Sequence, residues 1–138
     1  MADVARHTLH LAVPPGDVDA VHSLLEAVWA EAPGIPMMER FRFETALLEL
    51  ASNVVKHADG GSGLWCTLEI DAHPEHIEAT VLDDGEPSDA QILLPREMPD
   101  ELAESGRGIA MIQALVDDLT YSREGTTNRW SISRRFAS

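Results

Sequence analysis

The sequence predicts one α+β domain, spanning residues 1–138, in which helices cover one face of a mixed, mostly antiparallel sheet. Two observations support this prediction. Helical segments and pairs of alternating segments occur in blocks rather than in strict alternation, which is typical of a two-layer α+β sandwich. The chain has 138 residues, of which 44% are hydrophobic, so it can bury one core but not two.

The first half of the chain contains a predicted strand followed by two predicted helices. Leu9, Leu11 and Val13 alternate with polar or small residues, which predicts a strand that ends at a Pro-Pro-Gly run. Apolar residues then recur at helical spacing over residues 18–32. A second helix is predicted over residues 37–58, where an apolar stripe has separations of four, three and four residues: Phe43, Leu47, Leu50 and Val54.

The second half contains two predicted hairpins, a loop and a third helix. Residues 88–104 hold two prolines and no sustained periodicity, which predicts a loop that can act as a lid. An apolar helix is predicted to start near residue 106. Alternation predicts two strands that form one hairpin and two that close the chain: 64–70, 77–81, 121–123 and 130–136.

The charge balance and the apolar runs bear on partners and location. Ten basic against 24 acidic residues give a formal net charge of -14, which disfavours direct binding of nucleic acid or anionic lipid. The longest apolar run, residues 109–116, is too short to span a bilayer, and no signal segment begins the chain. We therefore expect a cytoplasmic protein. The acidic surface suits either a basic protein partner or solubility alone.

One pair of polar residues lies on the second predicted helix. Glu49 and Asn53 are four positions apart, so their side chains lie on successive turns beside the apolar stripe. A rigid pair at the border of a buried face suits metal positioning and proton abstraction. Taken alone, the pair is more simply explained as a solvated glutamate and asparagine.

Two glycine-containing motifs lie farther along the chain. Asp83 and Gly85 follow a predicted strand, where the carboxylate can enter a cleft, although an Asp-Gly pair often marks only a turn. Gly106, Arg107 and Gly108 precede an apolar helix, whose first N–H groups favour an anion such as phosphate. The alternative for these glycines is a flexible joint in a loop.

The order and spacing of the three motifs resemble the GHKL superfamily, and within it the anti-sigma-factor serine/threonine kinases. The resemblance extends from about residue 9 to residue 136 and implies the Bergerat ATP-binding fold, with nucleotide between the helices and the lid. Many members have glycine in place of Pro87, but proline is familiar in the anti-sigma branch. The motifs are Glu49-Leu-Ala-Ser-Asn53-Val-Val-Lys-His57-Ala58, Asp83-Asp84-Gly85-Glu86-Pro87 and Gly106-Arg107-Gly108-Ile109-Ala110-Met111-Ile112.

The resemblance implies a role for each site residue. Glu49 acts as general base, Asn53 supplies an oxygen to magnesium, and Asp83 accepts a hydrogen bond from the adenine amino group. Magnesium would also offset the charge of the nucleotide, which adds about four negative charges to an already acidic protein. Arg107 either contacts phosphate or balances the acidic loop. The remaining nucleotide-binding residues that the resemblance implies are Gly85, Gly106, Arg107, Gly108 and Thr127.

For the histidines and the cysteine, the sequence favours structural roles over metal binding or reactivity. His57 continues the helix that carries Glu49, and a packed histidine is favoured there over a metal ligand. Cys66 lies in an alternating strand, where a structural role is favoured over a reactive one. The other histidines show no convincing zinc spacing, so we expect no zinc site: His7, His10, His22, His73 and His76.

The resemblance implies an ATP-dependent anti-sigma factor. Such a protein is a homodimeric serine/threonine kinase that sequesters a sigma factor and phosphorylates an anti-anti-sigma antagonist. Two alternatives stay open: a noncatalytic ATP-binding regulatory module, and the detached catalytic domain of a histidine kinase. Retention of Glu49 favours a kinase, and the loop of 18 residues between Pro87 and Gly106 favours the anti-sigma branch.

Overall fold

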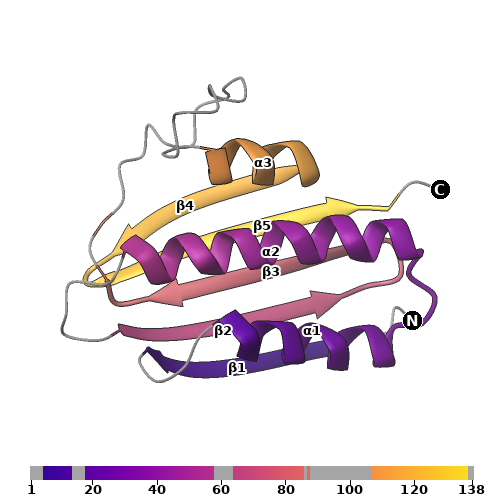
Figure 1. Ribbon diagram of the computed structural model, residues 1–138, viewed down its shortest axis with the longest axis horizontal. Helices are drawn as coiled ribbons and strands as arrows, with labels where there is room; N and C mark the ends of the chain where they lie inside the picture. Colours follow the sequence, from indigo (N-terminus) through magenta and orange to yellow (C-terminus); the bar gives the residue numbers. More distant parts are fainter. Residues whose placement is uncertain (1–4, 14–17, 58–63, 86, 88–106, 137–138) are drawn as a thin grey trace.

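A five-stranded sheet with helices on one face forms the domain (Figure 1). The computed structural model describes residues 5–13, 18–57, 64–85, 87 and 107–136. The predicted α+β class is confirmed. The elements, in chain order, are β1 (Ala5–Val13), α1 (Val18–Glu31), α2 (Met37–His57), β2 (Leu64–Ala72), β3 (His76–Asp83), α3 (Arg107–Leu115), β4 (Asp118–Glu124) and β5 (Thr127–Arg135).

The sheet has the strand order β1-β2-β3-β5-β4, and every pair of neighbouring strands in it is antiparallel. The described strands therefore form an antiparallel sheet rather than the mixed sheet that the sequence suggested. Two helices connect β1 to β2, so the chain runs twice along one face of the sheet before β2 pairs antiparallel with β1. Strands β3 and β4 run in the same direction, but β5 lies between them and prevents a parallel pair.

The core lies between the helices and one face of the sheet. On β3, buried residues alternate with more exposed ones, as expected for a strand with one covered face. The helix α2 carries the apolar stripe predicted from its spacing, and all four of its side chains are buried. The two layers thus meet through one continuous cluster that includes Phe43, Leu47, Leu50, Leu68, Ile77 and Ile132.

Several strands extend beyond their apolar patterns. Strand β1 begins at Ala5 rather than Leu9, and β4 begins at Asp118 rather than Tyr121. Arg6 shows one cause, because its guanidinium donates to both carboxylate oxygens of Asp71 on β2, at 2.6 and 3.1 Å. Such polar pairs on the open face of the sheet continue the strands where the hydrophobic alternation has ended.

An ion pair joins the start of α2 to the last strand. Glu39 is 5% exposed, and Nε of Arg134 on β5 donates to its carboxylate at 2.6 Å. Nη1 of Arg134 also donates to the backbone oxygen of Leu115, the last residue of α3, at 2.8 Å. One arginine therefore ties together α2, α3 and β5. None of the described helices has the length and apolar character needed to cross a membrane.

Candidate nucleotide site

A buried carboxylate lies at the end of β3. Asp83 is the last residue of that strand, and only 5% of its surface is exposed. The backbone N–H of Gly85 and the side-chain amide of Asn128 both donate to its Oδ1, each at 2.8 Å. No described residue donates to Oδ2, so that oxygen remains able to accept a hydrogen bond from a ligand.

Asn128 holds this carboxylate in place from the neighbouring strand. It lies directly opposite Asp83 in the β3–β5 pairing and is 2% exposed. The hydroxyl of Tyr121 and Nη1 of Arg123 donate to its Oδ1, at 2.5 and 2.9 Å. Its amide nitrogen also donates to the backbone oxygen of Gly85, at 3.2 Å. These contacts fix which end of the Asn128 amide faces Asp83.

The surroundings of Asp83 act on its charge in opposite directions. Burial raises the pKa of the Asp83 carboxyl above its ordinary value, while hydrogen bonds from Asn128 and Gly85 lower it. The neighbouring Asp84 carboxylate raises the pKa further, and the Arg123 guanidinium lowers it. A buried carboxylate with one oxygen that accepts no hydrogen bond costs folding free energy. Such groups are typical of sites that recognise a ligand.

The predicted pair on α2 contacts the first turn of α3. Glu49 and Asn53 are both half-buried. A Cβ atom placed on Gly108 would lie 2.5 Å from Oε1 of Glu49 and 2.7 Å from Nδ2 of Asn53. Carbon atoms do not approach side chains so closely, and glycine therefore allows α3 to begin against this pair. The structure thus brings together three residues that the sequence singled out.

The first turn of α3 also offers backbone N–H groups. Helix α3 begins at Arg107, and its N-terminal N–H groups and dipole favour an anion near Asn53. Gly106 and the side chain of Arg107 lie outside the described residues, so their predicted phosphate contacts stay predictions. In Figure 1 the C-terminal half of α2, the end of β3 and the start of α3 lie toward the same side of the molecule.

The nucleotide contact predicted for Thr127 stays a prediction. Thr127 is the first residue of β5, opposite Glu124 across the turn, and its side chain is exposed. Successive side chains of a strand point to opposite faces, so Thr127 points away from the face on which Asn128 meets Asp83. The sequence analysis missed Asn128 because it is separated from Asp83 by 45 positions, and only the β3–β5 register pairs them.

Two further residues of the sequence analysis lie near these elements. Cys66 is paired opposite Asp83 in the β2–β3 register and is buried. Burial, with the nearby carboxylates of Asp83 and Asp84, raises the pKa of its thiol to about 12, which supports a structural role. The side chain of His57 and the loop at residues 88–104 lie outside the described residues.

Comparison with known proteins agrees with the class of protein that this geometry defines, an ATP-binding α+β sandwich. Residues 11–132 match the family model of the histidine kinase-like ATPase domain. The chain therefore belongs to the histidine kinase-like ATPase domain family. No curated protein matches it closely enough to be counted as a relative.

One similar solved structure contains the RsbU and RsbW domains of Rv1364c from Mycobacterium tuberculosis. The two share 18% sequence identity with a TM-score of 0.62, and the match covers 94% of this chain. It covers 32% of the other chain, so this chain spans about a third of the length of that chain. At this identity the likeness establishes the fold alone.

Proposed function

We propose that this chain is an anti-sigma factor with serine/threonine kinase activity, which uses ATP to phosphorylate an anti-anti-sigma antagonist. The observation that carries the proposal is the packing of Gly108 against Glu49 and Asn53. This packing places a carboxylate, an amide oxygen and a helix N-terminus side by side. Phosphoryl transfer uses such groups as a base, a metal ligand and a phosphate-binding site. The resemblance of the three motifs to anti-sigma-factor kinases supplies the choice of substrate and partners.

The chemistry of the described residues suits ATP and magnesium. Asp83 offers a buried acceptor for the adenine amino group, and the N-terminus of α3 offers N–H groups to phosphate. Asn53 offers an amide oxygen, a ligand type that magnesium accepts. Magnesium bound there would offset phosphate charge in a protein of formal net charge -14.

In the proposed reaction, the serine hydroxyl oxygen of the antagonist bonds to the γ-phosphorus of ATP. The bond between that phosphorus and the β–γ bridging oxygen breaks, so ADP leaves and phosphoserine forms. Glu49 takes the hydroxyl proton, which places the general base on a rigid helix beside Asn53. The contribution of the protein is mainly positioning, because this transfer requires little covalent participation by the enzyme.

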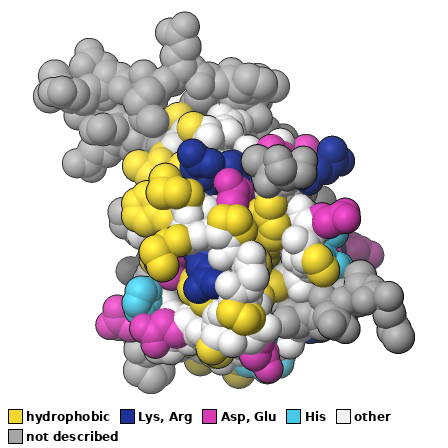
Figure 2. Space-filling view, turned by 90° about the vertical axis from the view of Figure 1, so that its right-hand side faces the viewer, with side chains coloured by type: hydrophobic (Ala, Val, Ile, Leu, Met, Phe, Trp, Pro, Cys, Tyr) yellow, Lys and Arg dark blue, Asp and Glu magenta, His cyan; other side chains and the backbone are white. Residues whose placement is uncertain are grey.

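The partner part of the proposal, which includes a homodimer and a sequestered sigma factor, draws support from the surface. Met37, Met38 and Phe41 project from the first turns of α2 and are 76%, 60% and 61% exposed. Apolar side chains gather on this side of the molecule (Figure 2). Exposed apolar groups of this kind mark protein-binding surfaces. Sedimentation velocity tests the homodimer, and pull-down with sigma factors tests sequestration.

Replacement of Glu49 tests the kinase mechanism. Loss of a general base typically slows a reaction by about a hundredfold to ten-thousandfold, so Glu49→Gln should slow phosphorylation of the antagonist serine to that extent. Nucleotide affinity should change much less, because Asp83 and Asn53 are unaltered. Labelled ATP under single-turnover conditions measures the rate, and calorimetry measures the affinity.

Glu44→Gln is the matched control on the same helix. Glu44 is half-buried and accepts a hydrogen bond from Nε1 of Trp29 at 3.3 Å, which a glutamine oxygen can also accept. Its replacement should leave the rate unchanged. A wild-type rate in Glu49→Gln would eliminate Glu49 as the base. A wild-type protein that binds ATP but phosphorylates no antagonist would favour a noncatalytic regulatory module.

A further inference from the structure

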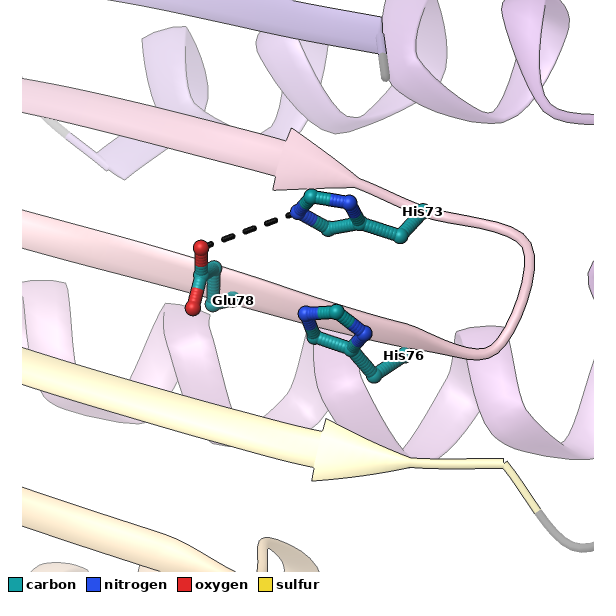
Figure 3. A group of neighbouring side chains, drawn as sticks. All are labelled: His73, His76 and Glu78. Atoms are coloured by element: carbon teal, nitrogen blue, oxygen red, sulfur yellow. Dashed lines mark ion pairs between the residues drawn. The ribbon is translucent and has the colours of Figure 1, made fainter. Parts of the chain in front are cut away.

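His73, His76 and Glu78 gather at the turn between β2 and β3 (Figure 3). His73 directly follows β2 and His76 begins β3, and the backbone N–H of His73 donates to the backbone oxygen of His76 at 2.9 Å. Glu78 lies two positions beyond His76 and therefore on the same face of β3. The potential ligand atoms of the three side chains all lie within 4.8 Å of one another.

The two histidine rings lie against each other at the turn. They stack with their centroids 4.1 Å apart and their planes at 10°. Nε2 of His73 is buried and makes no hydrogen bond, and it lies 3.7 Å from Oε1 of Glu78. A buried polar atom without a hydrogen bond costs free energy, and it therefore calls for an explanation in a folded protein. A ligand held between His73 and Glu78 would supply the missing interaction.

We propose that His73, His76 and Glu78 bind a divalent transition-metal ion, with Zn²⁺ as the ion best suited to them. Zinc accepts imidazole nitrogen and carboxylate oxygen at about 2.0–2.2 Å, so neighbouring ligand atoms of a tetrahedral site lie about 3.3 Å apart. The 3.7 Å between Nε2 of His73 and Oε1 of Glu78 is close to this separation. The ring of His76 must turn out of the stack to reach the same ion, because a metal lies in the plane of the imidazole that binds it. The Glu78 side chain is 48% exposed, which leaves the fourth ligand position to solvent.

A further carboxylate near the cluster is already paired with a cation. Asp71 lies opposite Glu78 in the β2–β3 register, but its carboxylate is bound by the guanidinium of Arg6 at 2.6 Å. Asp71 is therefore already neutralised. Two imidazoles and one carboxylate are a donor set that favours zinc, copper or nickel over magnesium or calcium.

This site is separate from the candidate nucleotide site. His76 and Glu78 lie on the open face of β3, whereas Asp83 lies on the face that the helices cover. His76 and Asp83 are also the first and last residues of an eight-residue strand, which places them about 23 Å apart. Zinc binding at the turn is therefore independent of ATP and of the magnesium that Asn53 would hold.

Calorimetric titration of zinc chloride into the full chain without nucleotide tests the proposal. We expect one ion per chain. Loss of a group that merely supports a ligand typically costs about 10-fold to 100-fold in metal affinity, so His73→Ala or His76→Ala should weaken binding at least about tenfold. Zinc should also raise the melting temperature of the wild type but not of His76→Ala, because the ion ties the ends of β2 and β3 together.

His22→Ala is the matched control. Nε2 of His22 on α1 lies 3.5 Å from Oε1 of Glu26. This contact pairs one histidine with one glutamate, as at the turn, but it includes no second histidine. Replacement of His22 should leave zinc affinity unchanged. Glu78→Gln, at an exposed position, keeps the test valid if a histidine variant unfolds. Zinc affinity that is unchanged in His76→Ala and Glu78→Gln, or no zinc binding by the wild type, would overturn the proposal.

Discussion

Replacement of Asp83 by asparagine separates ligand recognition from stability. In Asp83→Asn the amide oxygen can keep both hydrogen bonds that Oδ1 now accepts, from Gly85 and Asn128. The amide nitrogen then stands in the place of Oδ2, where we propose that the wild type offers an acceptor to the adenine amino group. The variant therefore presents a donor to a donor, while its contacts within the protein are preserved.

The magnitude follows from the kind of hydrogen bond that is lost. A hydrogen bond to a charged group contributes about 1.5–3 kcal/mol, which corresponds to about a 10-fold to 150-fold loss of ATP affinity. Stability should move the other way. Burial raises the pKa of Asp83, so its ionisation costs the folded state free energy once the pH rises above the ordinary value of 3.8. Asparagine removes this cost, and the free energy of unfolding at pH 7 should equal or exceed that of the wild type.

Calorimetry with ATP and magnesium measures the affinity, and urea denaturation measures the free energy of unfolding. The control is Asp84→Asn, because Asp84 is exposed and accepts a hydrogen bond from the backbone N–H of Trp65 at 2.8 Å, which an amide oxygen can also accept. That variant should bind ATP as the wild type does. If Asp83→Asn also binds ATP with unchanged affinity, Asp83 does not recognise adenine and the site lies elsewhere.

Two further predictions concern the contacts that position the site. Gly108→Ala should lower the free energy of unfolding by about 1–3 kcal/mol and weaken ATP binding, since a methyl group would lie 2.5 Å from Oε1 of Glu49. Urea denaturation and calorimetry that match the wild type would contradict this packing. Glu39→Gln should cost about 1–3 kcal/mol at pH 7 because it breaks a buried ion pair with Arg134. The hydrogen bond from Arg134 is the main cause of the lowered pKa of Glu39, so its stabilisation is present above the ordinary pKa of 4.5 and lost as the pH falls below it. Denaturation curves between about pH 6 and pH 3 should therefore show a steeper loss in the wild type than in Glu39→Gln, and parallel losses would refute this assignment.

Periodicity predicted the helices and the core better than it predicted the ends of strands. The stripe on α2 repeats at helical spacing because four large side chains must enter one core. This pattern is local, so a short window of the sequence over α2 is enough to detect it. The start of β1 is different. It depends on the pairing of Arg6 with Asp71, which is 65 positions away and lies on the open face of the sheet. Hydrophobic alternation contains no information on such a pair.

The same distinction applies to the candidate site. Glu49 and Asn53 are local neighbours on one helix, so their placement beside the apolar stripe follows from helical geometry. Asn128 is polar, follows two threonines and belongs to no motif, and its role depends on the β3–β5 register. A buried polar residue opposite a motif carboxylate becomes visible only when the strands are paired. Thr127, chosen by resemblance, precedes Asn128 on β5, so its side chain lies on the other face of the sheet.

The turn at His73 shows a further consequence of strand pairing. The sequence search looked for histidines at zinc spacing with cysteine or carboxylates, and His73 and His76 did not meet that criterion. In the hairpin they become direct neighbours, and Glu78 joins them because alternate residues of a strand share a face. Pairing of β2 with β3 therefore creates a donor set that linear spacing does not show.

The distribution of positive charge leads us to expect that nucleotide binding at the candidate site depends on a cation. Arg6, Arg42 and Arg134 form ion pairs with carboxylates, so their charges are already balanced within the protein. Arg123 lies at the Asp83 end of the sheet, but its Nη1 is bound to the backbone oxygen of Gly85 at 3.0 Å and to Asn128. A triphosphate would therefore meet an acidic protein in which Arg123 already binds residues of the site. Backbone N–H groups of α3 can bind phosphate oxygens without adding net charge, so binding should depend strongly on a divalent cation at Asn53.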